Sequence, residues 1–220
     1  MEFSTILFHY CVQGLCKFLS HRSRTRLIRL ALARTHVPVK YSEGFNPRMS
    51  VIYCPPSPVG VSVDNDFFTA KCRSSFQAED LLLERMNRFL PEGFTIKDLC
   101  MLSKAGEKDQ AGREMIAVYE FHFLSDQAGI EEKVSALLQR KEILFSRKGK
   151  KEKNVRPSIH GVMARPGEKS FSIEARLSAG QETYLSPLDF LTLFFSADNV
   201  LSCVSITRKG FTFTGSERYV

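Results

Sequence analysis

The order of the predicted strands and helices limits the possible folds of this chain more than any other feature of its sequence. A strand pattern at the start is followed by a helix pattern without Gly or Pro, for which Ser20 is a suitable N-cap. The strand patterns lie at 3–12, 51–55, 66–72 and 94–102, and the helix patterns at 20–35 and 77–89. The order strand, helix, strand, strand, helix, strand predicts a ferredoxin-like arrangement, an antiparallel sheet with both helices on one face.

The same order of patterns recurs after a polar linker at 103–113, with one additional strand pattern. The later strand patterns lie at 115–124, 143–147, 153–163, 169–177 and 200–208, and the helix patterns at 127–140 and 186–195. We therefore predict an α+β protein with two tandem ferredoxin-like (βαββαβ) halves and antiparallel sheets. The halves comprise residues 1–102 and 114–220, and this repeat rests on element order alone, without obvious sequence identity between the halves.

The composition favours a cytoplasmic protein. No run approaches the roughly 20 apolar residues that span a bilayer, and Glu2 stands where a signal peptide has positive charge. The six cysteines form no CxxC pair and no Cys/His cluster with zinc spacing; they are Cys11, Cys16, Cys54, Cys72, Cys100 and Cys203. We expect free thiols in a reducing compartment, with no bound metal, no cofactor and no membrane contact.

The chain has a formal net charge of +7, which favours polyanions as partners. Recognisable catalytic motifs are absent from the sequence, including GxSxG, HExxH, the Walker loop and GxGxxG. The five histidines are isolated in the sequence. His21 is the best catalytic candidate among them, because it lies at the start of an arginine-rich helix and a histidine there could act as acid or base in RNA cleavage.

The helix predicted at 20–35 has a basic face. At about 100° per residue, Arg22, Arg26 and Arg29 fall on one side, and Leu27, Ile28 and Ala31 fall on the opposite side. No acidic residue occurs between Glu2 and Glu43, so local ion-pair partners are missing. Guanidinium groups suit phosphate binding, although a solvated basic face is the alternative.

The loop that follows combines two aromatic residues, a carboxylate, an amide, a glycine and an arginine. Such a loop can stack a base, hydrogen-bond its edge and bind a phosphate. The predicted binding residues are Tyr41, Glu43, Phe45, Asn46 and Arg48. In the alternative interpretation the loop is a structural turn, in which Phe45 packs in the core and Glu43 pairs with Arg48.

A third basic feature lies at 146–156, where six basic residues accompany the single acid Glu152, a net charge of +5. Such a segment gathers phosphate by counterion release without reading sequence. Its candidate binding residues are Arg147, Lys148, Lys150, Lys151, Lys153 and Arg156. The alternative is a solubilising hairpin tip.

Several of these motifs together resemble a known bacterial family. They are Phe18-Leu19-Ser20-His21, the arginine helix, Tyr41-Ser42-Glu43-Gly44-Phe45-Asn46-Pro47-Arg48, the Pro55–Gly60 segment, Val155-Arg156-Pro157 and Ile206-Thr207-Arg208-Lys209-Gly210. They resemble the domain of unknown function 2344 family, which occurs alone or fused behind B12-binding radical SAM proteins. The resemblance is strongest over residues 14–60.

The chain also departs from that family's pattern. Arg22 and Ser23 stand where the family has Leu-Asp, and a family acidic position falls near Phe68 and Thr69. Any role of those acids is therefore not carried over. The chain lacks the CxxxCxxC motif for an iron–sulfur cluster, so the resemblance implies a radical SAM partner and not the radical enzyme itself.

Three functions fit these features. The first is an RNA-binding accessory protein that acts on rRNA or tRNA during processing or modification, alongside a radical SAM partner. The second is an adaptor that binds a radical SAM enzyme without contacting RNA. The third is a metal-independent RNA endonuclease or RNA-modifying enzyme, because CRISPR RNA endonucleases also use tandem ferredoxin-like domains; His21, Tyr41 and Arg48 are its candidate residues.

Overall fold

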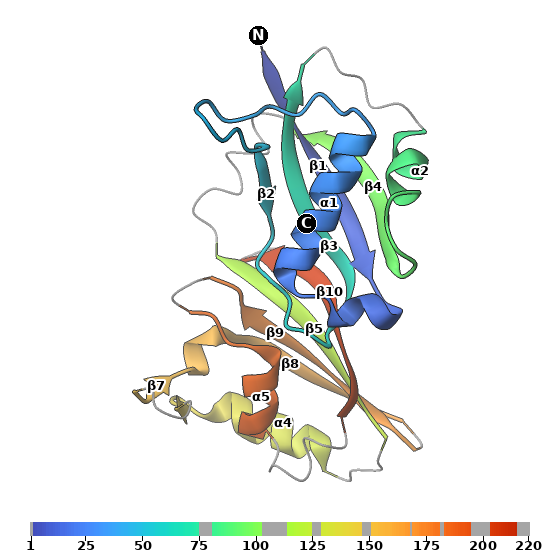
Figure 1. Ribbon diagram of the computed structural model, residues 1–220. Coiled ribbons are helices and arrows are strands. Elements are labelled where there is room, and N and C mark those ends of the chain that lie inside the picture. The colour runs from blue at the N-terminus through green and yellow to red at the C-terminus, as the bar shows by residue number, and fades with distance from the viewer. Residues whose placement is uncertain are drawn as a thin grey trace. The chain divides into compact units, whose positions relative to one another are not determined.

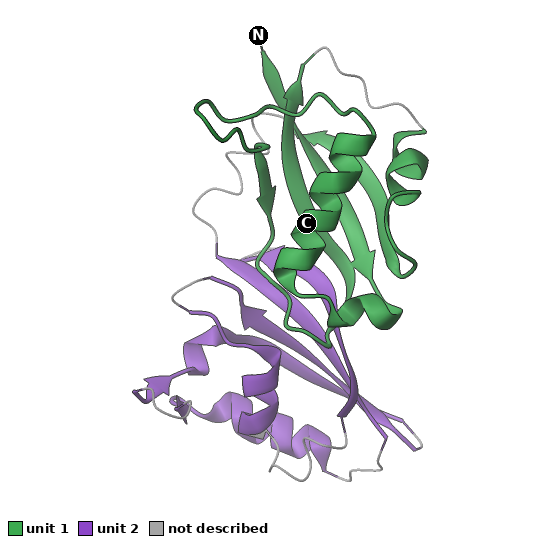
Figure 2. Cartoon of the chain, viewed as in Figure 1, with its two compact units in different colours: residues 1–112 green, residues 113–220 purple. Residues whose placement is uncertain are grey.

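The protein is α+β, with mainly antiparallel strands. The computed structural model describes residues 2–74, 81–102, 114–124, 129–146, 151–167, 169–180, 183–194 and 203–214. The chain divides into two compact units, residues 1–112 and 113–220, which Figure 2 colours separately. The predicted linker at 103–113 lies outside the described residues.

Unit 1 has one antiparallel sheet with strand order β4-β1-β3-β2 (Figure 1). Its elements are β1 (Phe3–Val12), η1 (Gly14–Phe18), α1 (His21–Arg34), β2 (Val51–Tyr53), β3 (Ser62–Arg73), α2 (Leu82–Asn87) and β4 (Phe94–Leu102). Helices α1 and α2 both contribute to a single hydrophobic core with one face of the sheet. The predicted order of strands and helices in this half is therefore present.

The core of unit 1 follows from the two-residue alternation of a strand. Residues 6, 8, 10 and 12 of β1 are all buried and belong to the core cluster. The Phe8 ring stacks on Phe68 with centroids 4.7 Å apart, and Tyr10 stacks on Phe94 at 5.3 Å. Offset aromatic packing of this kind adds to the gain from burial, and it ties β1 to both neighbouring strands.

Helix α1 matches the sequence-based prediction to within one residue at each end. The Ser20 side chain accepts a hydrogen bond from the backbone N–H of Ser23, which is the expected N-cap contact. Ile28 and Ala31 are fully buried on the side away from the basic face. Local signals were sufficient here because capping and helical periodicity depend on neighbouring residues only.

Two elements of unit 1 differ from their predicted bounds. Strand β3 begins at Ser62, four residues earlier than predicted, and its pairing with β1 shifts register between Asp66 and Val63, where Asp64 and Asn65, two residues of low strand propensity, stand. Helix α2 is confined to Leu82–Asn87 among the described residues, and residues 77–80 of the predicted helix lie outside them.

Within unit 2 the strands pair antiparallel in the order β10-β5-β9-β8, and the unit contains helices α4 and α5 (Figure 1). Its elements are β5 (Met115–Phe123), α4 (Ile130–Gln139), β6 (Leu144–Phe145), β7 (Lys153–Asn154), η2 (Arg156–Ser158), β8 (Ile159–Pro166), β9 (Phe171–Ser178), α5 (Pro187–Phe194) and β10 (Cys203–Phe213). Phe190 of α5 packs on Phe121 of β5, with ring centroids 5.5 Å apart. This contact anchors α5 on the sheet.

The segment predicted as one strand at 153–163 is interrupted. Strand β7 pairs with β6 in a separate two-stranded ladder, and a 3-10 turn at Arg156–Ser158 precedes β8. Pro157 lacks the N–H that a continuous ladder would need. The Asn154 side chain instead accepts hydrogen bonds from the backbone N–H groups of Ile143 and Arg156.

The described helices include none with the length and apolar character required to cross a membrane. The six cysteines are free thiols. Burial raises the pKa of the Cys72 and Cys203 thiols to about 11, so both remain protonated at neutral pH. In the described part of the chain, His, Cys, Asp and Glu side chains form no cluster of three or more suited to a metal ion.

Candidate functional site

The basic face of α1 is exposed as predicted. Arg22, Arg26 and Arg29 are all exposed and lie at i, i+4 and i+7, on one side of the helix. None of the three forms an ion pair within the described residues. The arginine stripe, as we name these three residues, therefore presents free guanidinium groups to solvent.

Arg24 of the same helix has a different role. Its side chain is only 2% exposed, and its Nη2 donates a hydrogen bond to the backbone carbonyl of Lys17 at 2.8 Å. It therefore links the start of α1 to η1. A buried guanidinium that serves a backbone carbonyl is structural, so the arginines of α1 divide into an exposed group and a buried one.

Strand β2 packs beside α1 (Figure 1). The Tyr53 ring contacts His21 edge to face, with centroids 6.2 Å apart, and the Tyr53 hydroxyl donates to the carbonyl of Thr25 at 3.4 Å. Burial raises the pKa of Tyr53 to about 12, while the nearby Arg29 guanidinium opposes this shift. His21, the catalytic candidate, thus lies against an aromatic ring at one edge of the arginine stripe.

The loop between α1 and β2 has a tightly hydrogen-bonded base. The backbone N–H of Ser42 donates to the carbonyl of Arg48 at 2.8 Å, and the N–H of Arg48 donates to the Ser42 hydroxyl at 2.9 Å. Below them, the Lys40 N–H donates to the carbonyl of Lys71 in β3, and the Lys71 N–H donates to the carbonyl of Ser50. The loop is therefore fastened to the sheet, and residues 43–47 form its tip.

Every side chain from residue 41 to residue 48 is exposed. Tyr41 is 48% exposed, and Phe45 is fully exposed at the tip, so the alternative in which Phe45 packs in the core is wrong. The alternative ion pair is also absent in the described structure, because neither Glu43 nor Arg48 forms one. A fully exposed phenylalanine on a loop with a fixed base is a feature of binding surfaces.

The third basic feature is only partly described. Arg147, Lys148 and Lys150 lie outside the described residues, whereas Lys151 and Lys153 are exposed.

Arg156 does not fit the phosphate-binding role suggested by the sequence. Its guanidinium donates to three backbone carbonyls, from Nε to Arg140 at 3.0 Å, from Nη1 to Ile159 at 2.9 Å and from Nη2 to Leu138 at 2.9 Å. It caps the carboxyl end of α4 and joins that end to β8, and the helix dipole favours a cation there. Arg156 therefore leaves the candidate binding set.

Sequence reasoning missed a polar cluster in unit 2. The buried Ser178 hydroxyl donates to Glu114 Oε1 at 2.7 Å, and the Thr183 hydroxyl donates to the same oxygen at 2.8 Å. His160 Nε2 lies 2.9 Å from Ser178 Oγ and 3.8 Å from Glu114 Oε2. Glu114 and His160 lie 64 and 18 residues before Ser178, so no spacing signal could have indicated the cluster.

The direction of these hydrogen bonds argues against a nucleophile in this cluster. The Ser178 proton is directed at the carboxylate, so His160 Nε2 is the donor toward Ser178 and not a base acting on it. Hydrogen bonds from Ser178 and then Thr183, together with His160, hold the pKa of Glu114 below its ordinary value of 4.5, although burial opposes the shift. The cluster is suited to fixing the ends of β5, β8 and β9.

Comparisons with known proteins identify a family and similar solved structures. The family profile that matches residues 5–187 is described as an uncharacterized protein conserved in bacteria, DUF2344. No curated protein matches the chain. A crystal structure of an unknown protein from Galdieria sulphuraria is similar at 12% identity and a TM-score of 0.29, over 96% of this chain and 98% of that chain. Because the family profile covers most of the sequence, as the motifs predicted, the chain belongs to the DUF2344 family of uncharacterized bacterial proteins.

Proposed function

We propose that this protein is an RNA-binding accessory protein that acts in the processing or modification of rRNA or tRNA, alongside a radical SAM partner. One observation carries the proposal. Unit 1 exposes three arginines without described ion-pair partners on α1, and the next loop along the chain, whose base is hydrogen-bonded, exposes aromatic, amide and guanidinium side chains. Those are the groups that bind phosphates and unstacked bases.

The arginine stripe supplies the phosphate contacts. Arg22 and Arg29 are separated by two helical turns, or about 10 Å at a rise of 1.5 Å per residue. That separation allows the stripe to follow a short length of RNA backbone. Guanidinium groups bind phosphate in a forked, charge-assisted geometry, and the rigid helix reduces the entropy that is lost on binding.

The loop supplies the base contacts. Phe45 and Tyr41 offer exposed ring faces on which unpaired bases can stack. Glu43 and Asn46 can accept or donate hydrogen bonds at a base edge, and Arg48 can bind the flanking phosphate. Bases are accessible in this way only where they are unpaired, so we infer that the target is single-stranded RNA or a loop in a folded RNA.

We also infer that the two units are tandem ferredoxin-like halves joined by the segment 103–113. The strand orders β4-β1-β3-β2 and β10-β5-β9-β8 support this, because both have the first strand between the third and the fourth. RNA-recognition modules with four-stranded sheets use this architecture, although such an analogy bears on the fold and does not by itself establish a function. The radical SAM partner is inferred from the motif resemblance alone.

A second candidate function is favoured by one observation. Phe45 is fully exposed at the loop tip, and a protruding aromatic residue is also the kind of anchor that protein interfaces bury. In this alternative the loop binds a radical SAM enzyme, and the protein acts as an adaptor without RNA contact.

The test is RNA binding by the purified protein across a salt series, with Arg22, Arg26 and Arg29 all changed to Gln. For single-stranded RNA we expect the slope of log affinity against log salt to fall by about 2, since each phosphate contact contributes about 0.7. The matched control removes three charges elsewhere in unit 1, by Lys71→Gln, Arg73→Gln and Arg88→Gln. This control should change the slope much less.

If the two triple variants lower the salt slope by the same amount, the effect comes from net charge alone. The assignment of the arginine stripe as the binding site is then wrong. If the unmodified protein retains no RNA at modest ionic strength, the RNA proposal is wrong. A complex with a radical SAM protein that survives high salt and is lost in Phe45→Ala would then establish the adaptor function.

A further inference from the structure

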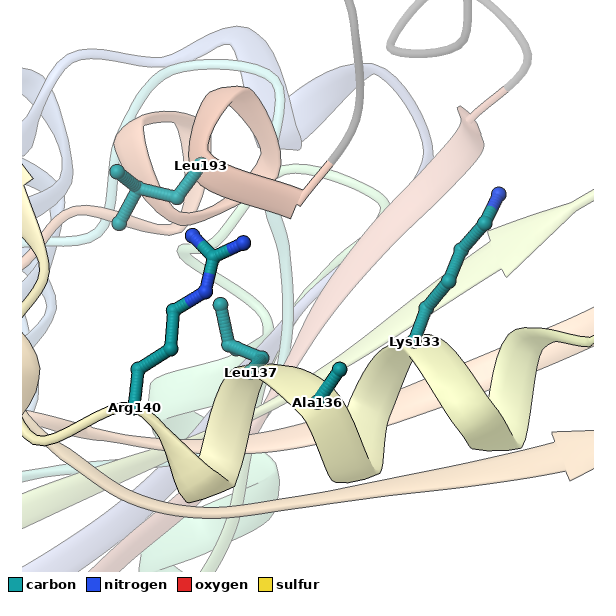
Figure 3. A pocket seen from close by; sticks show the side chains of 5 residues that line it. All are labelled: Lys133, Ala136, Leu137, Arg140 and Leu193. Atoms are coloured by element: carbon teal, nitrogen blue, oxygen red, sulfur yellow. The ribbon is translucent and has the colours of Figure 1, made fainter.

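Unit 2 contains a pocket between α4 and α5 that the proposed RNA surface does not include. Figure 3 shows its lining residues, which are Lys133, Ala136, Leu137, Arg140 and Leu193, and its volume is about 270 Å³. Lys133, Ala136 and Leu137 lie at i, i+3 and i+4 on one face of α4, Arg140 is the C-cap residue of that helix, and Leu193 lines the pocket from α5. A volume of this order suits a small ligand and not a protein segment.

The shape of the pocket follows from side-chain size. The small Ala136 lies between two long side chains, Lys133 of α4 and Arg140 at its C-cap. Leu137 is only 5% exposed and forms the floor. Figure 3 shows the Arg140 guanidinium extending toward Leu193, while Lys133 stands at the other end. The result is an open surface hollow that combines an apolar floor with two cationic side chains.

These two cations have no described ion-pair partners. Lys133 and Arg140 are exposed, and neither pairs with an acid among the residues that the structure describes. Glu132, next to Lys133 in the sequence, has its carboxylate near Gly129 at the start of the helix, and Glu142, two residues after Arg140, is exposed and forms no ion pair with it among the described residues. Among the described residues, the pocket therefore combines an apolar floor with two positive charges that no acid pairs.

The end of α4 that carries Arg140 is also held in place. Arg156 donates to the backbone carbonyls of Arg140 and Leu138, so the last turn of the helix is clamped. A fixed backbone lowers the conformational entropy that Arg140 would lose on binding an anion. This gives Arg156, which the sequence placed among the RNA-binding residues, an indirect part in a different site.

We infer that this pocket binds a small amphiphilic anion, a molecule with an apolar body and a phosphate or carboxylate group. Leu137, Ala136 and Leu193 contact the body, and the guanidinium of Arg140 and the ammonium of Lys133 bind the charged group. A bare phosphate would leave the apolar floor uncovered, and a neutral apolar ligand would leave both charges without a partner.

The experiment uses the full chain and the fluorescent probe 1-anilinonaphthalene-8-sulfonate, which combines apolar rings with one anionic group. We expect saturable binding to one site, weakened about tenfold by Ala136→Leu, which fills the hollow without altering charge; that is a loss of about 1.4 kcal/mol. Ser135→Leu is the matched control, because it adds the same side chain to an exposed position of α4 outside the pocket. It should leave the affinity within about twofold.

A second pair of variants tests the charges. Lys133→Gln combined with Arg140→Gln should lower the affinity for the probe by about tenfold. Lys141→Gln should not lower it, because Lys141 is exposed and does not line the pocket. Octyl phosphate and octanoate, used below their micelle concentrations, should displace the probe, whereas octyl glucoside should not. The more effective competitor identifies the preferred anion as phosphate or carboxylate.

Three results would overturn the inference. They are the absence of saturable binding, equal effects of Ala136→Leu and Ser135→Leu, and displacement by octyl glucoside as strong as that by the two anions. Displacement by an RNA oligonucleotide but not by octyl phosphate or octanoate would also reject a small ligand and would assign the pocket to RNA. None of these outcomes depends on the arginine stripe of unit 1.

Discussion

Arginine has opposite roles at different positions of this chain. Arg22 and Arg26 are exposed and unpaired within the described residues, whereas Arg24 and Arg156 donate to backbone carbonyls. Their side-chain chemistry is identical, and what differs is whether a carbonyl without a helical partner lies within reach. For this reason a count of basic residues overestimates the number of side chains that can bind an anion. An arginine near an unpaired backbone carbonyl donates to that carbonyl instead.

Glu114 allows a pH test at the scale of one residue. Its pKa is lowered in the folded protein by the Ser178 and Thr183 hydroxyls, so its carboxylate stabilises the fold above the ordinary value of 4.5. That contribution is lost as the pH falls through the lower pKa of the folded state. We expect Glu114→Gln to reduce the free energy of unfolding at neutral pH and to have a smaller effect about one unit below 4.5.

Urea denaturation at the two pH values measures the difference. Glu131→Gln, at an exposed glutamate of α4, is the control and should show little effect at either pH. If the effect of Glu114→Gln is the same at both pH values, the carboxylate charge does not contribute in the way we describe.

At the scale of elements, unit 1 depends on a close backbone approach between the chain after β1 and the chain before β4. The backbone N–H of Gln13 donates to the carbonyl of Gly93 at 2.7 Å. Gly93 has a φ of +85°, and a Cβ atom at this position would lie 2.6 Å from the Gln13 carbonyl oxygen. Only glycine satisfies both the conformation and the contact.

Gly93→Ala should therefore destabilise the protein by roughly 2–4 kcal/mol, the sum of a left-handed backbone penalty and a backbone clash. Gly14→Ala separates the two effects, because Gly14 has a φ of +55° but a Cβ atom added there would meet no heavy atom within 4 Å. It should cost only about 1 kcal/mol. Chemical denaturation of both variants measures the difference. If both lose the same free energy of unfolding, the close approach between Gln13 and Gly93 does not contribute to the cost of Gly93→Ala.

At the scale of the whole molecule, the net charge of +7 is spread over features that act differently on an anionic partner. In the proposed RNA-binding function, the exposed Lys151 and Lys153 contribute an attraction to phosphate that does not depend on sequence, because it comes from counterion release. The exposed Phe45 ring can contribute only by stacking, which depends little on salt. The contribution of the lysines and that of the Phe45 ring can therefore be separated by how each responds to ionic strength.

We expect Lys151→Gln combined with Lys153→Gln to weaken RNA binding uniformly across sequences and to reduce the salt slope by about 1. Phe45→Ala should weaken binding by about 1–3 kcal/mol, preferentially for unpaired targets, while the salt slope stays the same. Titrations of single-stranded and duplex RNA at several salt concentrations measure both effects. A change of slope in Phe45→Ala, or equal losses for duplex and single strand, would contradict the stacking role.

The sequence alone predicted the features that depend on neighbouring residues. Helix α1, its Ser20 cap and its exposed arginine stripe follow from capping and helical periodicity, and the α+β class follows from the order of the patterns. The same local signals located the loop that carries Phe45, but they left open whether that ring was buried or exposed. Local patterns report the propensity of a segment and do not report its tertiary partners.

Only the tertiary structure decided the features that depend on distant residues. Arg156 is structural because it reaches carbonyls 16 and 18 residues earlier, and Glu114 meets hydroxyls 64 and 69 residues later. The pocket likewise needs Leu193 of α5 beside the Ala136 face of α4. Such contacts form only when the chain folds back on itself. The roles of Arg156 and Ala136 therefore depend on residues that lie far away in the sequence and that no local pattern includes.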